Sequence, residues 1–80
     1  MQKNGHKPNP KQFVVCVDND GYPASLERRK IYIAVSDPIA EKNGLIRVID
    51  ESGDDYLYPR QLFRPIVLPE PVRKAVLAAA

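Results

Sequence analysis

Short apolar blocks alternate with polar, turn-forming segments along the chain. Five of these blocks are rich in β-branched and aromatic residues and have the length of strands: 13–17, 31–35, 45–49, 55–58 and 64–68. Glycine, proline, asparagine and aspartate gather between the blocks, where they favour turns. The pattern therefore predicts five short strands joined by loops, and an all-β fold class.

Two further segments favour helix. In 36–44, Asp37 is suited to accept from free amides as an N-cap, Pro38 fits the first helical position, and Gly44 permits a left-handed exit. After Pro69, apolar residues recur at helical spacing in 71–80. We expect a short helical turn between the second and third strands and a short C-terminal helix. That helix packs on the strands, packs on a partner, or frays.

The central feature is the corner at 54–66, where an apolar, aromatic strand meets Pro59 and continues into a second apolar run. We expect a short 3₁₀ turn over 59–63, with Tyr58 and Phe63 in the core. The loop at 50–54 carries Gly53, which suits a hairpin turn that needs a positive φ. The strand 31–35 is apolar on both faces, so alternation does not reveal which face points inward.

These segments divide the chain into three parts. Residues 1–12 are polar and basic and predict a flexible tail, either a solvated leader or an arm that touches phosphates. Residues 13–68 form a strand domain, and 69–80 form a C-terminal helix or tail. The apolar core of a signal peptide and a membrane-length apolar stretch are both missing, which predicts a cytoplasmic protein without a membrane partner.

Composition adds few constraints. The chain has 80 residues, of which 44% are hydrophobic, and a net charge of +2 that permits nucleic acid as a partner without indicating it. Its one cysteine, Cys16, excludes an internal disulfide. Cys16 lies in an apolar strand and is expected to be a buried, inert thiol.

The order of elements resembles the small Src-homology-3 barrel. Residues 13–19 (FVVCVDN) resemble the first strand of that family, and 25–29 (SLERR) resemble its Ser-Leu-Lys-Lys-Gly diverging turn. Residues 57–62 (LYPRQL) lie where that family has an aromatic residue, an aliphatic residue and Pro-Ser-Asn-Tyr. The resemblance covers about 13–68 and implies a five-stranded barrel like those of small bacterial domains with no assigned activity.

The peptide groove of that family is not retained. Its aromatic ridges hold a proline-rich ligand by packing against the rings of a polyproline helix. The corresponding positions here are Val17, Asn19, Leu45, Leu57 and Leu62, and the chain has no tryptophan. Only Pro59 matches the groove. The resemblance therefore implies a barrel that does not bind the usual proline-rich peptide.

Candidate chemistry is sparse. The acidic cluster at 50–55 is interpreted as a solvated turn, because a hairpin tip does not present the six or more converging oxygens of a hard cation site. One histidine, His6, and one cysteine cannot form a zinc site. We expect no catalytic residues, no metal, no cofactor and no enzyme activity.

Two functional hypotheses remain. The first is a non-catalytic protein-interaction module with an unidentified protein partner and an apolar patch formed by Leu45, Tyr56, Leu57, Pro59 and Leu62, unless the C-terminal helix covers that patch. The alternative is a small basic nucleic-acid-binding barrel that uses Lys11, Arg28, Arg29 and Lys30. The sequence is expected to form a monomer in either case.

Overall fold

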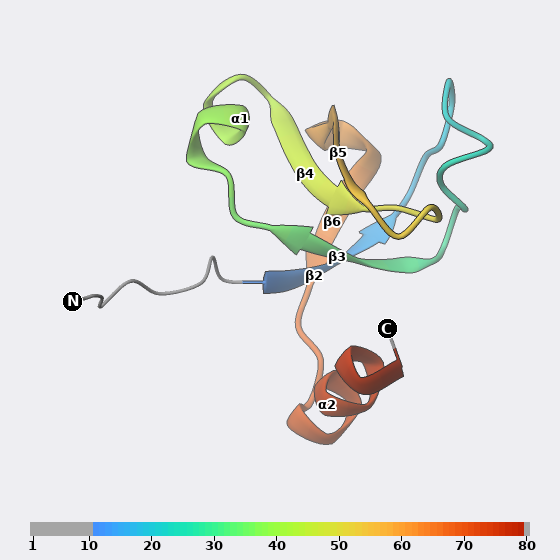
Figure 1. Cartoon of the computed structure of the whole chain (residues 1–80), viewed down its shortest axis with the longest axis vertical. Coiled ribbons are helices and arrows are strands. Elements are labelled where there is room, and N and C mark those ends of the chain that lie inside the picture. Colours follow the sequence, from blue (N-terminus) through green and yellow to red (C-terminus); the bar gives the residue numbers. More distant parts are fainter. Residues whose placement is uncertain (1–10, 80) are drawn as a thin grey trace.

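The computed structural model describes residues 11–79 (Figure 1). Its strands are β2 (Lys11–Cys16), β3 (Ile31–Val35), β4 (Leu45–Ile49), β5 (Asp55–Pro59) and β6 (Phe63–Ile66). The helical elements are α1 (Pro38–Lys42), the 3₁₀ turn η1 (Arg60–Leu62) and α2 (Glu70–Ala79). The five predicted strands and both predicted helices are thus present. The first strand begins at Lys11, inside the segment predicted as a tail, and residues 1–10 of that segment lie outside the described part of the chain.

The strands form one antiparallel sheet in the order β5-β4-β3-β2-β6. β2 pairs with both β3 and β6, with Phe13 opposite Ile33 on one side and Ile66 on the other. β5 and β6 therefore occupy opposite edges, although only η1 separates them in sequence. The five antiparallel strands confirm the all-β class. The sheet is bent but does not close, so a closed barrel is not observed.

The inner face of this bent sheet holds the core. Val14, Cys16, Tyr32, Ala34 and Val48 point inward from β2, β3 and β4 and pack in one cluster. Tyr58, Leu62 and Phe63 enter the same cluster from the corner, and Leu26 enters from the loop before β3. The prediction that Tyr58 and Phe63 are core residues is confirmed, since each is 4% exposed.

The register settles which face of β3 is buried. Tyr32 and Ala34 point inward, while Ile31, Ile33 and Val35 lie on the outer face with Leu45 and Leu57 of the neighbouring strands. The outer face thus carries partly covered apolar side chains together with the Arg47–Asp55 ion pair. α2 lies beside β2 and β6, where the Arg73 guanidinium lies 5.9 Å from the centre of the Phe13 ring (Figure 1).

Local hydrogen bonds explain where α1 begins. Asp37 Oδ1 accepts from the Ala40 amide at 3.1 Å, and Pro38 occupies the first turn. These are the N-cap and first-turn roles that the sequence predicts for the two residues. Gly44 then leaves the helix with a φ of +75°. The predicted helical turn and its left-handed exit are both confirmed.

Arg29 has a backbone conformation that a side chain disfavours. Its φ is +70°, and it is the only non-glycine residue with positive φ in the described range. Its amide donates to the Cys16 carbonyl at 2.7 Å, which fixes the bend leading into β3. A left-handed conformation costs a residue with a Cβ about 1 kcal/mol relative to glycine.

Replacing Arg29 with glycine is therefore expected to raise the free energy of unfolding by about 0.5–1 kcal/mol, measured by urea denaturation. Arg28 is the matched control, because it lies in the same exposed turn but does not have positive φ. Arg28→Gly should lower stability by about 0.5–1 kcal/mol through the entropy of the unfolded chain. Equal destabilisation by both substitutions would contradict a strained Arg29.

Candidate functional site

The residues of the predicted apolar patch do not form one surface. Leu62 is 4% exposed and belongs to the core, so its assignment to an exposed patch is wrong. It is buried because η1 turns its side chain under the inner face of the sheet. Leu45 and Pro59 are paired across β4 and β5 on the outer face, and Leu57 lies on the same face.

Tyr56 projects from the opposite side of β5, next to the inward-facing Tyr58 along the strand. It is 51% exposed, whereas Leu57 is 41% exposed on the outer face. α2 does not cover either residue, because it lies beside β2, three strands away from β5 (Figure 1). What remains of the predicted patch is Leu45, Leu57 and Pro59 on the outer face, with Tyr56 on the other.

The basic residues proposed for nucleic-acid contact are also dispersed. Arg28 and Arg29 are exposed at the bend before β3. Lys30 donates to Glu51 Oε2 at 2.6 Å and lies over the Tyr32 ring, so its charge is already paired. Lys11 begins β2 opposite Val35. Cys16, about 16 Å further along the same strand, donates its amide hydrogen to the Lys30 carbonyl. The backbone therefore separates Lys11 from the basic bend.

A hydrogen-bonded network joins the hairpin loop at 50–54 to the core. The Tyr58 hydroxyl donates to Asp50 Oδ2 at 2.5 Å, and the Ser52 amide and hydroxyl donate to Asp50 Oδ1 at 2.8 and 2.6 Å. Burial raises the pKa of Asp50, but the hydrogen bonds from Ser52 and Tyr58 outweigh it and leave that pKa below its ordinary value. These hydrogen bonds thus favour the carboxylate form of Asp50 and hold it within the loop.

A second network fixes the other side of the same loop. The Tyr32 hydroxyl accepts from the Glu27 amide at 2.7 Å and donates to Glu51 Oε2 at 2.5 Å. Hydrogen bonds from Lys30 and Tyr32 lower the pKa of Glu51. Burial and the Glu51 hydrogen bond raise the pKa of Tyr32. These hydrogen bonds link the 27–30 bend to the hairpin, so the acidic cluster holds the two loops together.

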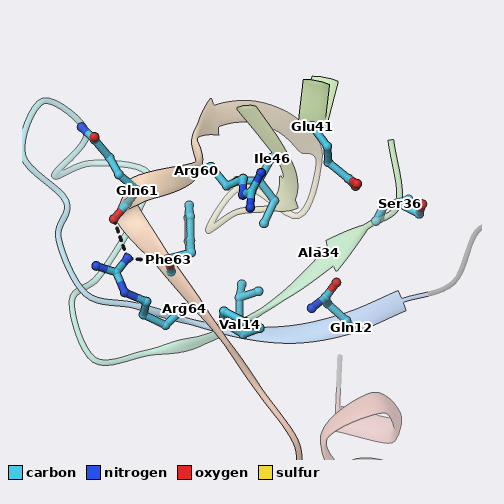
Figure 2. Close-up of a pocket in the computed structure, with 12 residues that line it drawn as sticks. Gln12, Val14, Ala34, Ser36, Glu41, Ile46, Arg60, Gln61, Phe63 and Arg64 are labelled. Atoms are coloured by element: carbon cyan, nitrogen blue, oxygen red, sulfur yellow. Dashed lines mark hydrogen bonds between the residues drawn. The ribbon is translucent and has the colours of Figure 1, made fainter. Parts of the chain in front are cut away.

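One concavity of the described residues opens on the inner face, at the end of the core away from these networks. Its volume is about 450 Å³, within the range of small ligand sites. The floor is apolar, and Figure 2 shows Val14, Ile46 and Phe63 converging on it beside Ala34. The pocket is therefore a place where the edge of the hydrophobic core can be reached from outside.

Polar groups surround the mouth of this pocket. They are Gln12 of β2, Ser36 and Glu41 on either side of the α1 start, and Arg60, Gln61 and Arg64 of the corner. Arg64 is folded back, donating to the carbonyls of Gln61 and Phe63 at 3.0 and 2.9 Å. The ion pairs among residues 11–79 do not include Arg60. Arg60 is thus the cation of the rim that can meet a ligand.

The pocket forms because the inward-facing side chains become smaller along β3 and the residue that follows it. Tyr32, Ala34 and Ser36 follow one another at alternate positions, so the core is filled at one end and hollow at the other. The sequence analysis missed Gln12, Ser36 and Arg60 as site residues. The decreasing size at positions 32, 34 and 36 was the available signal, but its meaning depended on knowing which face points inward.

Other chemistry is weakly represented in the described residues. Burial raises the pKa of the Cys16 thiol, and Cys16 is fully buried, as predicted for an inert residue. Within 11–79, histidine, cysteine and carboxylate side chains nowhere gather in threes around a point that could hold a metal ion. None of the helices in that range has the length and apolar character needed to cross a membrane. His6 lies outside the described residues.

Comparison with known proteins does not assign a family. No protein-family model matches the chain, and neither a curated protein nor a solved structure matches it.

The Asp50 network predicts a pH-dependent effect of Tyr58→Phe. Loss of the hydroxyl should lower the free energy of unfolding at pH 7 by about 1–3 kcal/mol, because a buried carboxylate loses a donor. Since the folded pKa of Asp50 is depressed, this contribution is present above the unfolded pKa of about 4 and is lost as pH falls through the folded value.

Urea denaturation at pH 7 and pH 3 measures the effect, and Tyr56→Phe is the control. Tyr56 lies on the same strand but is half exposed, so its variant should change stability by less than about 0.5 kcal/mol. An equal loss for Tyr58→Phe at both pH values would show that packing, and not the Asp50 charge, is responsible.

Proposed function

We propose that this chain is a non-catalytic protein-interaction module of Src-homology-3-like fold that binds a short peptide segment at the pocket beside Arg60. The observation that carries the proposal is an apolar pocket of about 450 Å³ with a polar rim containing an unpaired arginine. Such a pocket suits one apolar side chain of a partner, held in place by polar contacts around it.

The fold assignment is supported by features beyond the strand count. The first strand lies between the second and the last, and a 3₁₀ turn follows Pro59 at the corner. Arg29, which has positive φ, occupies the position at which the Src-homology-3 diverging turn carries glycine. That coincidence supports the proposed alignment because glycine adopts positive φ without strain.

A peptide matches the rim better than other ligands do. Gln12 and Gln61 each offer a donor and an acceptor, and Ser36 offers both in one hydroxyl, which complements the amides and carbonyls of a peptide backbone. Arg60 favours a partner carboxylate, while Glu41 already accepts from the Asp37 amide at 3.1 Å. We therefore expect the partner segment to carry an apolar residue with an acidic residue nearby.

Nucleic-acid binding is the weaker candidate. A single-stranded ligand needs cations that follow its backbone and exposed aromatic rings on which bases stack. Tyr22 and Tyr56 are exposed, but Lys30 is paired with Glu51 and so does not offer a free cation to a nucleic-acid backbone. Arg28 and Arg29 remain as an exposed pair, too few to be favoured over an ordinary solvated turn.

Peptide selection tests the proposal directly. Peptides from a displayed random library are selected on the full chain, and the affinity of a selected peptide is measured by fluorescence anisotropy. Ser36→Phe should weaken binding about tenfold or more, because the added ring fills the pocket and displaces an apolar anchor. Lys42→Phe is the control, since Lys42 is exposed on α1 but does not line the pocket.

Arg60→Glu gives an independent readout, because it should select against acidic residues in the bound peptide. Failure to enrich any peptide, or equal binding by the Ser36→Phe and Lys42→Phe variants, would remove the pocket as the binding site. Titration of single-stranded DNA at low salt tests the alternative. If wild-type binds the DNA and Arg28→Glu with Arg29→Glu abolishes binding, the nucleic-acid hypothesis replaces the peptide hypothesis.

A further inference from the structure

The two edges of the open sheet differ in the hydrogen-bonding groups that they present. On β6, alternate residues bond to β2, which leaves Phe63 and Pro65 facing the edge. The Phe63 amide already donates to the Arg60 carbonyl, and the Phe63 carbonyl accepts from Arg64 at 2.9 Å. Pro65 has no N–H. The β6 edge thus has no free amide with which to begin a new strand pair.

The β5 edge is different. The Arg60 amide donates to the Gly44 carbonyl and the Asp50 amide to the Asp54 carbonyl, so positions 54, 56, 58 and 60 point toward β4. By alternation, the backbone groups of Asp55, Leu57 and Pro59 point away from the sheet. The hydrogen bonds among the described residues do not include a partner for the outward Leu57 amide and carbonyl. Leu57 and Tyr56 are also exposed, so β5 presents the open edge of the sheet.

We propose that β5 pairs antiparallel with β5 of a second copy of this chain, about a two-fold axis at Leu57, to join two sheets edge to edge. In this register each Leu57 amide donates to the Leu57 carbonyl of the other copy. Each Asp55 amide donates to the Pro59 carbonyl of the other copy, and the missing N–H of Pro59 removes a bond only at the margin. This proposal replaces the expectation of a monomer.

Charge selects the second copy and this register. With Leu57 opposite Leu57, Asp54 of one copy lies opposite Arg60 of the other, which places opposite charges together twice. Centring the pair on Asp55 would instead place two carboxylates face to face. Centring it on Pro59 would lose the Leu57 donors. Acidic residues and proline ordinarily protect a sheet edge from pairing. In this symmetric antiparallel pair, the acidic start of one β5 lies beside the end of the other β5, where Pro59 and Arg60 are found.

Sedimentation equilibrium of the full chain over a range of concentrations tests the pairing. We expect a reversible dimer, and Leu57→Pro should make the chain monomeric because it removes the outward amide while leaving the bonds to β4 in place. Asp54→Arg should raise the dimer dissociation constant about tenfold by placing like charges together. The double variant Asp54→Arg with Arg60→Asp should restore the dimer, since the charges are exchanged.

The Asp54→Arg variant and the double variant still test the pairing if Leu57→Pro fails to fold, because Asp54 lies in an exposed loop. A monomer at every concentration, or a dimer unaffected by Asp54→Arg, would overturn the proposal. Failure of the double variant to recover the dimer would overturn the register. Peptide binding at the pocket is tested separately by Ser36→Phe, which should leave the dimer unchanged. The Asp54→Arg variant is assessed by dimerisation alone, because Arg60 belongs both to the pocket rim and to the proposed pairing.

Discussion

The packing of Leu62 and Phe63 under the sheet is the constraint on which the rest of the molecule depends. Leu62 ends the 3₁₀ turn that follows Pro59, Phe63 begins β6, and each is 4% exposed. Their burial forces the chain to leave β5 at one sheet edge and enter β6 at the other. The loop before β3 supplies the remaining cover through Leu26, which is fully buried.

This solution leaves the core unequally filled. At the hairpin end, Tyr58 and Tyr32 bring hydroxyl groups that are bonded to Asp50 and Glu51, so large aromatic side chains pack without unsatisfied polar atoms. At the other end, Ala34 is followed by Ser36, and the pocket opens between α1 and the corner. The same strand, β3, thus contributes Tyr32 to the hydrogen-bonded end of the core and Ala34 to the end at which the pocket opens. The pocket thus lies at the end of the core away from the hydrogen-bonded networks.

The sequence predicted the elements well because their signals are local. Asp37 and Pro38 mark the start of α1, and Pro59 marks the corner, without reference to distant residues. The site was not predictable in the same way. Leu62 was assigned to an exposed patch because it corresponds to a peptide-groove position of the Src-homology-3 family, whereas the tertiary packing of η1 buries it. Gln12 and Ser36, distant in sequence from Arg60, meet it only through the strand order.

Edge chemistry follows from the same corner and could not be derived from composition. Proline occurs in both edge strands, but its effect depends on position. Pro65 lies in the middle of β6 and its backbone faces outward, where it offers no N–H. Because the Phe63 amide and carbonyl are also hydrogen-bonded, the β6 edge has no free amide for pairing. Pro59 lies at the end of β5, which leaves the outward amides of Leu57 and Asp55 available. A protein that needs one partner surface without uncontrolled aggregation requires this asymmetry, because two open edges would allow sheets to add at both ends, whereas one open edge limits self-association to a closed pair.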